Sequence, residues 1–338
     1  MGQQRSAWVL VGALLGATCS AYAQAPASLQ PLRWNADALG NHRYLLEVKA
    51  AAKAVHVVIP WRRRDAHPEQ VAVIVTGPDG KPVANVLRGS ISQAEGELLF
   101  EAAQAGTYAI YYQPYVSKGR SNYPTVTYAA PTDTADAAWA HKVGTDARAW
   151  RKLPEAKVLR YEAVDDFDAY TSMERTATPE EVKALLAAHA NERLLVFPET
   201  REHPVRMFDA LPESWAKRGA GGALTDSALR GEYLSFQLGA WASHGKIDDV
   251  RVSFSDLRSD SGASIPATAL TCFNLGGVDY AGKPFTTRVD VVEGKIQPLW
   301  MGLDVPASAA PGVYHGEVTI AADGVSAQKI PLTITVEA

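Results

Sequence analysis

The sequence predicts a mainly β protein: two β-sandwich domains of immunoglobulin or jelly-roll type, joined by a mixed α/β connector. Short runs rich in β-branched and aromatic residues recur over 41–128 and again over 224–338. Turn chemistry such as the GPDG at 77–80 separates these runs. Between the two regions the apolar residues change to helical spacing. These three observations define the fold class.

The chain has 338 residues, of which 47% are hydrophobic, enough for more than one buried core. We expect a signal peptide at 1–23, a β-sandwich domain at 24–130, the connector at 131–220 and an immunoglobulin-like sandwich at 221–338.

The first residues have the three parts of a secretory signal. Arg5 supplies the positive end, an apolar run follows over 7–17, and the small-residue pattern AYA ends at Ala23, with Ala25 as the alternative end. We expect cleavage near Ala23 and a periplasmic or secreted protein. No later run approaches the roughly 20 apolar residues of a membrane span.

The first domain contains closely spaced strand signals with no helical period between them, which is typical of a sandwich. Its expected strands are HRYLLEVKA, AVHVVIPW, VAVIVT, VANVLRG, GELLFEA and GTYAIYYQPY.

The connector contains a capping box with proline at the first helical position, Thr178 to Glu181, so we expect a helix near 179–190. KVLRYEAVDDFDAY and RLLVFPE are each expected to pair as strands, and HPVRMFDALPESWAKRG to form a loop and a short helix.

The second domain has the strand count of an immunoglobulin-like fold. Tyr314 follows a proline and glycine turn, which suits a tyrosine corner. The expected strands are GEYLSFQLGAWA, DVRVSFSDL, ATALTCFN, TTRVDVV, IQPLWMGLDV, GVYHGEVTIAA and IPLTITVEA.

Cys272 would be the only cysteine left once the signal peptide, with Cys19, is removed. An internal disulfide is then excluded, and Cys272 is expected to be a buried, unreactive hydrophobe. The TCFNLGG around it has neither a nucleophile-elbow pattern nor a following helix for a phosphate loop. We expect a strand that ends near Phe273, a turn through Asn274 and Gly276–Gly277, and a loop that faces a partner domain.

Several stretches together resemble one family. They are, in the first domain, VIPWRRRD and GRSNYPTVTY, and, further on, PVRMFDALPESWAKRG, GEYLSFQLGAWA, VRVSFSDL and GKIQPLWMGLDVPASAAPGVYHGEVTI. In this order they resemble the non-catalytic N-terminal β-sandwich region of bacterial proteins related to glycoside hydrolase family 123. The resemblance implies that the chemistry of such proteins resides in a following (β/α)-barrel, where an acidic pair acts on an N-acetylated sugar. The sequence stops before such a barrel, so no catalytic residue carries over.

The sequence gives little support for a nucleic-acid, metal or cofactor site, or for a catalytic acid pair. A net charge of −4 without a basic stripe argues against nucleic acid. The acids Asp165, Asp166 and Asp168 are better explained by a solvated turn than by a catalytic pair, and neither they nor Asp256 with Asp260 match a calcium loop. No zinc or cofactor motif is present, and His56 between valines is expected to be structural.

Two groups of residues remain as binding candidates. Tyrosine and tryptophan rings stack on sugars, so Trp61, Tyr111, Tyr115 and Tyr123 are candidate carbohydrate contacts, although part of this set is expected in the core. The run Arg62, Arg63 and Arg64 either caps a strand with solvated charge or anchors a neighbouring domain through carboxylates, because the guanidinium group pairs bidentately.

We therefore expect an accessory region that scaffolds a catalytic barrel, supplied in cis or by a neighbouring protein. The alternative is a free-standing carbohydrate-binding protein, and a hydrolase in its own right is the third hypothesis.

Overall fold

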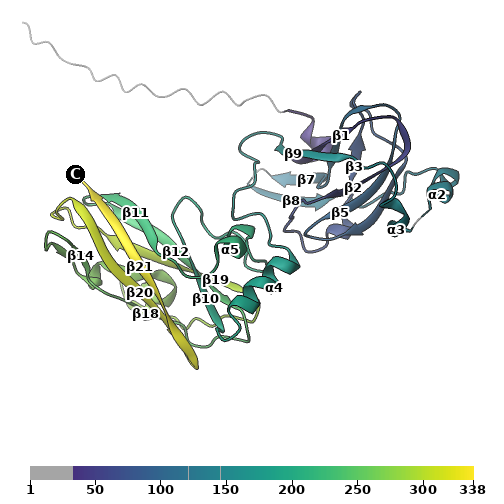
Figure 1. Cartoon of the computed structure of the whole chain (residues 1–338). Coiled ribbons are helices and arrows are strands. Elements are labelled where there is room, and N and C mark those ends of the chain that lie inside the picture. Colours follow the sequence, from purple (N-terminus) through teal and green to yellow (C-terminus); the bar gives the residue numbers. More distant parts are fainter. Residues whose placement is uncertain (1–32, 121, 145) are drawn as a thin grey trace, which may run out of the picture.

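The structure is a computed structural model that describes residues 33–338 except 121 and 145 (Figure 1). The signal peptide expected at 1–23, its cleavage site and Cys19 lie outside the described residues. Two lobes rich in β-structure lie side by side, and the fold is mainly β as predicted. Within 33–338, apart from the two omitted positions, no helix combines the length and apolar character needed to cross a bilayer.

The first lobe is a sandwich of a four-stranded sheet, in the order β3-β6-β1-β9, and a three-stranded sheet, in the order β2-β5-β4. The strands of the first sheet are β1 His42–Val48, β3 Ile74–Thr76, β6 Gly106–Tyr111 and β9 Lys157–Ala163. Those of the second are β2 Ala52–Ile59, β4 Val86–Ile91 and β5 Gly96–Ala102. Short helical elements at its periphery are α1 Ala36–Leu39, η1 Pro68–Gln70, α2 Ala137–Val143 and α3 Ala147–Trp150.

The second lobe is a larger sandwich. One sheet has the order β10-β12-β19-β16, with β10 Leu194–Glu199, β12 Tyr233–Ala242, β16 Leu270–Cys272 and β19 Ile296–Asp304. The other has the order β11-β21-β20-β14-β15, and β13 also pairs with β20. Its strands are β11 Leu224–Leu229, β13 Arg251–Phe254, β14 Leu257–Ser259, β15 Ser264–Ile265, β20 Gly312–Ala322 and β21 Val325–Glu337. The pair β11 and β21 is parallel.

Residues 131–220, expected as a connector, contribute to both sandwiches. Strand β9 pairs with β1 of the first lobe, and β10 pairs with β12 of the second. The helices α4 Pro179–Ala188 and α5 Glu213–Arg218 pack together over β10 and the end of β12, through Leu185, Phe197 and Trp215. The segment is therefore shared between the lobes: its strands join both sandwiches, and its two helices cover part of the sheet that contains β10 and β12.

The predicted capping box is confirmed at the start of α4. The Thr178 hydroxyl accepts a hydrogen bond from the Glu181 amide (3.2 Å), and Glu181 Oε2 accepts one from the Thr178 amide (2.8 Å). Two amide groups that the helix leaves without partners are thereby satisfied.

The tyrosine corner is also confirmed. The buried Tyr314 side chain donates its hydroxyl to the Ala310 carbonyl at 2.8 Å, just before β20 begins to pair with β21. The bond fixes the turn that brings the chain into the second sandwich.

Cys272 is buried, as predicted, and β16 ends at this residue. The expected turn through Asn274 and Gly276–Gly277 is wrong. Residues Phe273–Leu275 form a short 3-10 helix, η3, and β17 Gly276–Val278 then pairs with β18 Pro284–Thr286. A Cβ at Gly276 (φ +154°) would lie 2.4 Å from the Phe285 carbonyl oxygen, so the close pairing requires glycine. The strand expected over TTRVDVV is accordingly limited to its first threonine.

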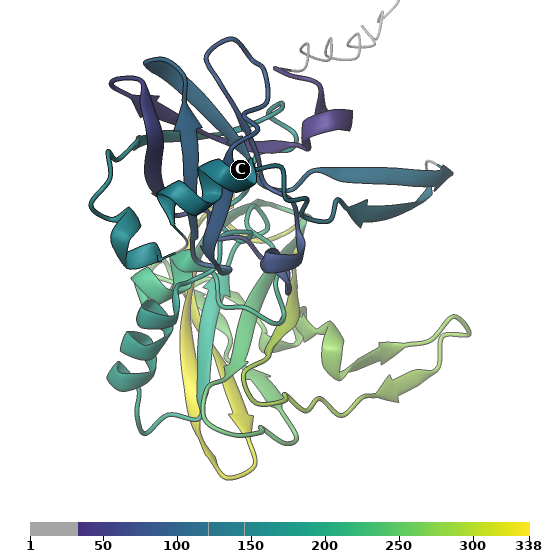
Figure 2. The same cartoon turned by 90° about the vertical axis from the view of Figure 1, so that its right-hand side faces the viewer.

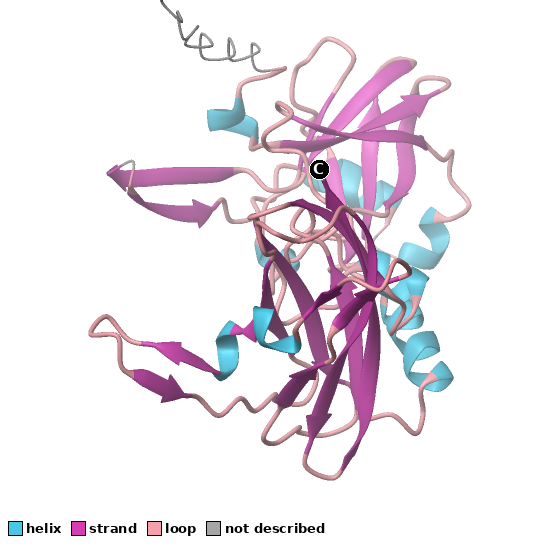
Figure 3. Ribbon diagram, turned by 90° about the vertical axis from the view of Figure 1, so that its left-hand side faces the viewer, coloured by secondary structure: helices cyan, strands magenta, loops and turns pink. Residues whose placement is uncertain are grey.

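Two hairpins project from the sandwiches. In the first lobe, β7 Tyr115–Arg120 pairs with β8 Tyr123–Tyr128, and in the second, β17 pairs with β18. Each hairpin forms a sheet of its own. Figures 2 and 3, which view the molecule from opposite directions, show both hairpins extending to the same side of the molecule.

Candidate functional site

Arg62 links the two lobes. It follows β2 and has φ of +49°, an unusual conformation for a residue with a Cβ. Its guanidinium group donates to Glu181 Oε2 (2.6 Å) and Oε1 (3.0 Å) on α4, and to the Thr176 carbonyl (3.2 Å). Its Nε also lies 3.3 Å from Glu213 Oε1 on α5. One side chain of the first lobe thus holds both helices of the second.

The Arg62 contacts are largely shielded from solvent. The side chains of Arg62 and Glu213 are each 14% exposed, and that of Glu181 is 26% exposed. The hydrogen bond from Arg62 holds the pKa of Glu181 below its ordinary value, and the same bond raises the pKa of Arg62. Both groups therefore stay charged at neutral pH, where the bidentate pair is strongest.

The other two arginines of the run have different positions. The Arg63 side chain is fully buried, donates to both oxygens of Asp65 (2.6 and 2.7 Å) and lies over the Trp61 ring at 4.9 Å. Arg64 is half-exposed and lies 3.6 Å from Glu174. The interpretation of the run as a solvated strand cap is therefore wrong for Arg62 and Arg63, and the bidentate carboxylate pairing between domains occurs at Arg62.

Two of the candidate sugar-binding rings lie in the core. Trp61 has no exposed surface, donates its indole N–H to the Ser92 carbonyl (2.8 Å), and packs on Gly96, where a Cβ would lie 2.0 Å from the ring. Tyr111 is also buried, and its hydroxyl accepts a hydrogen bond from Arg43 (3.0 Å). Neither ring offers a face to a ligand, so the expected sugar contact is not met at these two residues.

The other two candidates belong to the hairpin β7–β8. Tyr123, near its tip, is 84% exposed, and Tyr115 lies opposite Tyr128 at its base. A cavity of about 340 Å³ opens at this base, which we call the tyrosine pocket. Its lining consists of Asn41, His42, Gln113, Tyr115, Ser117, Pro124, Val126 and Tyr128.

His42 and Gln113 are polar residues of the tyrosine pocket that the sequence did not predict as site residues. The His42 ring stacks on Tyr170 (4.1 Å between centroids), and its Nδ1 lies 2.9 Å from the Tyr161 hydroxyl. Gln113 donates to Asp65 (3.3 Å) and accepts from the Tyr170 hydroxyl. Neither carries a motif, since both become site residues only when distant strands meet.

Burial lowers the pKa of His42 to about 4, an effect that nearby Glu174 opposes and Arg64 reinforces. His42 is therefore neutral at pH 7 and offers one donor and one acceptor nitrogen.

A group of exposed aromatic residues lies at the base of the other hairpin. Tyr233 on β12, Phe273 after β16 and Trp300 on β19 are each about half-exposed, and the Tyr233 and Phe273 rings lie 6.1 Å apart. The Trp300 amide donates to the Asn274 side chain at 2.6 Å. The hairpin itself adds exposed Val278, Tyr280 and Phe285. We call both hairpins together with Tyr233, Phe273 and Trp300 the hairpin face.

The acidic residues and His56 have structural roles in the described part of the chain. Asp165 caps the Asp168 amide (2.8 Å) in a turn, and exposed Asp166 pairs with Arg33 (2.8 Å). Buried His56 lies 2.9 Å from Glu97, the satisfied structural role expected for it. Across the residues that the structure describes, no group of three or more His, Cys, Asp or Glu side chains is arranged to hold a metal ion.

The Arg62 bridge predicts a matched pair of mutational effects. Arg62→Gln leaves the shielded Glu181 carboxylate without its cation, whereas Glu213 keeps its pairs with Arg175 and Lys217, so the free energy of unfolding should fall by about 1 to 3 kcal/mol. Arg64→Gln, which removes a longer and more exposed pair, should change it by less than about 0.5 kcal/mol. Urea unfolding at neutral pH measures both, and equal effects of the two variants would contradict the bridge.

Partly buried His42 predicts a pH dependence of stability. The unfolded chain binds this proton near the ordinary pKa of 6.5, whereas the folded chain binds it only near 4. Stability is therefore complete above about pH 6.5 and falls as the pH drops toward about 4. Between about pH 7.5 and pH 5, wild type should lose about 2 kcal/mol more than His42→Phe, which keeps the ring stack. Parallel losses in urea titrations of the two proteins would rule out His42 as the cause.

Comparisons with known proteins agree with the sheets described above. Two family models match the sequence: "Glycoside hydrolase 123, N-terminal domain" over 32–164, and "Glycoside hydrolase 123 N-terminal domain" over 273–322. The first spans the strands of the first sandwich, and the second runs from the start of η3 to the end of β20. The sequence matches no curated protein.

Solved structures with local similarity include a family 123 glycoside hydrolase from Clostridium perfringens (18% identity, 43% of this chain and 27% of that chain, TM-score 0.32). Others are the sporulation control protein Spo0M of Bacillus subtilis (9%, 43% and 50%, 0.25) and the fimbrial subunit MyfA of Yersinia enterocolitica (15%, 35% and 96%, 0.24). The chain thus covers about a quarter and a half of the lengths of the first two. The two family matches show that this chain carries a glycoside hydrolase 123-like N-terminal region.

Proposed function

We propose that the chain is the accessory N-terminal region of a secreted glycoside hydrolase-like protein, and that it scaffolds a catalytic barrel on its hairpin face. The barrel is supplied in cis or by a neighbouring protein. The observation that carries this proposal is the projection of one unsupported hairpin from each lobe to the same side of the molecule.

Packing against a partner would stabilise the two hairpins. An isolated two-stranded hairpin is at best marginally stable in water. All six residues of β8 and five of the six in β7 are exposed, so this hairpin gains little from its own lobe. A surface packed against the hairpins would bury their exposed Tyr123, Val126, Tyr280 and Phe285 side chains.

The composition of the hairpin face supports a protein partner. Aromatic residues are enriched in protein interfaces, and contiguous exposed apolar residues commonly mark such contacts. Tyr233, Phe273 and Trp300 give the second lobe such a group directly beside β17–β18.

A scaffold must also fix the distance between its contact points. One hairpin belongs to each lobe, so the lobe arrangement sets their separation. The shielded Arg62 contacts with Glu181 and Glu213 favour one arrangement, which supports a rigid mount for a single large partner.

The coding DNA beyond codon 338, and the genes beside it, test this function. We expect a barrel with an acidic pair, either in frame or in a neighbouring gene. With that barrel present, amide hydrogen exchange in β7–β8 and β17–β18 should slow by about tenfold or more, whereas α2, on another part of the first lobe, should be unchanged. Trp300→Ser should weaken the association by about tenfold relative to Val313→Ser, a control on the other sheet. A stop codon with no nearby barrel gene, or unchanged hairpin exchange, would overturn the proposal.

The tyrosine pocket supports a second candidate, carbohydrate binding without catalysis. Two tyrosines lie beside His42, whose Nε2 makes no hydrogen bond within the described residues, and this combination suits a sugar ring and one of its hydroxyls. A glycan-array screen of the purified chain should then retain a ligand with a Kd of about 1 mM or lower. Tyr128→Ala should abolish retention and Tyr280→Ala should preserve it. No retained glycan at millimolar concentration would remove this candidate.

A further inference from the structure

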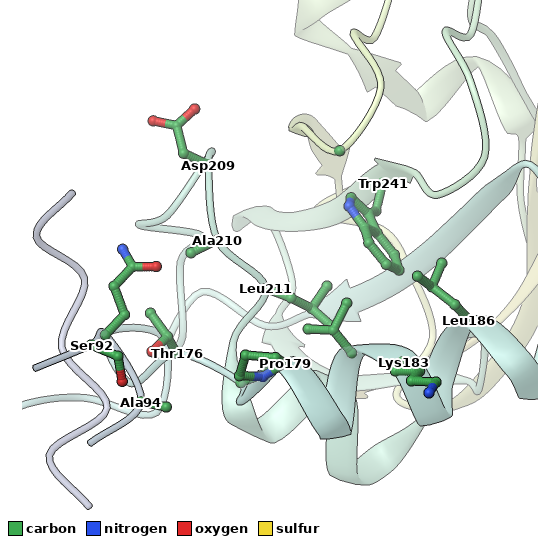
Figure 4. Close-up of a pocket in the computed structure, with 14 residues that line it drawn as sticks. Ser92, Ala94, Thr176, Pro179, Lys183, Leu186, Asp209, Ala210, Leu211 and Trp241 are labelled. Carbon is green, nitrogen blue, oxygen red and sulfur yellow. The ribbon is translucent and has the colours of Figure 1, made fainter. Parts of the chain in front are cut away.

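A cleft of about 610 Å³ lies where the two lobes meet (Figure 4). The turn between β4 and β5 forms its first-lobe side, and α4, the 209–211 loop and Trp241 form its second-lobe side. This volume lies within the range of small-molecule sites. The cleft is separate from both the tyrosine pocket and the hairpin face.

The lining of the cleft is mainly apolar. Pro179, Val182, Lys183 and Leu186 share one face of α4, as their three- and four-residue spacing dictates. The apolar lining residues are Ala94, Ala177, Pro179, Val182, Leu186, Ala210, Leu211 and Trp241. Burying the hydrocarbon part of a ligand against this lining would therefore be favourable, because it removes apolar surface from water.

The indole N–H of Trp241 makes no hydrogen bond to any other residue that the structure describes. Trp241 lies near the end of β12 between Leu195 and Ile296 and is only 5% exposed. Every other buried tryptophan in the described part of the chain donates its indole N–H at 2.6 to 3.0 Å; they are Trp61, Trp139, Trp150 and Trp215. No hydrogen bond within the described residues uses the Trp241 nitrogen, and Figure 4 shows it on the side of the ring that faces the 209–211 loop.

The other polar groups of the lining are mostly engaged. The Ser92 hydroxyl donates to the Glu95 carbonyl (3.1 Å), Gln93 donates to the Asp65 carbonyl (3.1 Å), and Asp209 pairs with Lys295 (2.7 Å). Among the described residues, Lys183 has no ion-pair partner. The groups left for a ligand are two donors, the Trp241 N–H and the Lys183 ammonium, and one acceptor, the Gln93 side-chain oxygen.

These groups define the ligand chemistry. A sugar with several hydroxyls would bury more polar groups than the Gln93 oxygen and the exposed Asp209 carboxylate can pair with in this mainly apolar lining, which is costly. An acceptor oxygen satisfies Trp241, and a negative charge on the ligand is favoured by Lys183 at the rim. We propose that the cleft binds a small carboxylate with an apolar body, whose hydrocarbon part packs between Leu186 and Leu211 and whose oxygen accepts the Trp241 N–H.

The indole N–H resonance of Trp241 reports directly on this site. In the ¹⁵N-labelled full chain, Trp241→Phe assigns the resonance. Octanoate, a carboxylate probe used below its micellar concentration, should shift it with a Kd of about 1 mM or lower, and should leave the Trp34 and Trp139 resonances unmoved. Octanol and octylammonium, which have the same chain without the anion, should bind at least about tenfold more weakly.

Two variants test the named donors. Lys183→Met should weaken octanoate binding by about fivefold or more without changing the affinity for octanol, whereas Lys142→Met on α2, a distant exposed lysine, should have no effect. Trp241→Phe keeps an aromatic ring in the cleft but removes the donor, and should weaken octanoate binding, measured by calorimetry, by a similar factor. A Trp241 resonance that does not move, or that octanol moves as strongly as octanoate, would overturn the proposal. Matching thermal unfolding curves would show that the variants are folded.

Discussion

The arrangement of the lobes depends on the ion pair between the Glu181 carboxylate and the Arg62 guanidinium group. Glu181 Oε2 accepts a hydrogen bond from the amide of Thr178, the residue that caps the start of α4. The same carboxylate accepts hydrogen bonds from the two terminal guanidinium nitrogens of Arg62 in the first lobe. One side chain therefore completes a helix N-terminus and joins the lobes. Its negative charge also lies at the positive end of the helix dipole, which favours the ionised form that Arg62 requires.

Each lobe brings a tryptophan packed on a strand glycine to this region. Trp61 lies on Gly96 of β5, and Trp215 lies on Gly239 of β12, where added Cβ atoms would lie 2.0 and 2.1 Å from the rings. Trp61 directly precedes Arg62 in the chain, and Trp215 belongs to α5, whose Glu213 is the second Arg62 partner. Close packing on each side thus fixes the backbone that presents the charged groups, and an ion pair is effective only when its geometry is held in this way.

Local signals in the sequence predicted local structure well. The capping box of Thr178 and Glu181 and the tyrosine corner at Tyr314 were both predicted, because each depends on residues a few positions apart. The burial of Trp61 and Arg63 was not predicted, since it arises from contacts with Ser92, Gly96 and Tyr112 that strand pairing brings together. The same reason explains why His42 and Trp241, which carry no motif, went unnoticed as candidate site residues.

The cleft at Trp241 and the Arg62 bridge share helix α4 and both lie where the two lobes meet. Ala94 and Trp241 line the cleft from opposite lobes, and Arg62 pairs with α4, the same helix that contributes Val182 and Leu186 to the cleft. A ligand that contacts both sides stabilises the arrangement that Arg62 also stabilises. By linkage, a ligand that reached Ala94 as well as Trp241 would bind more tightly when the Arg62 bridge is intact, and would stabilise that bridge in turn. Because each lobe carries one of the two projecting hairpins, the same arrangement sets the spacing of the hairpin face.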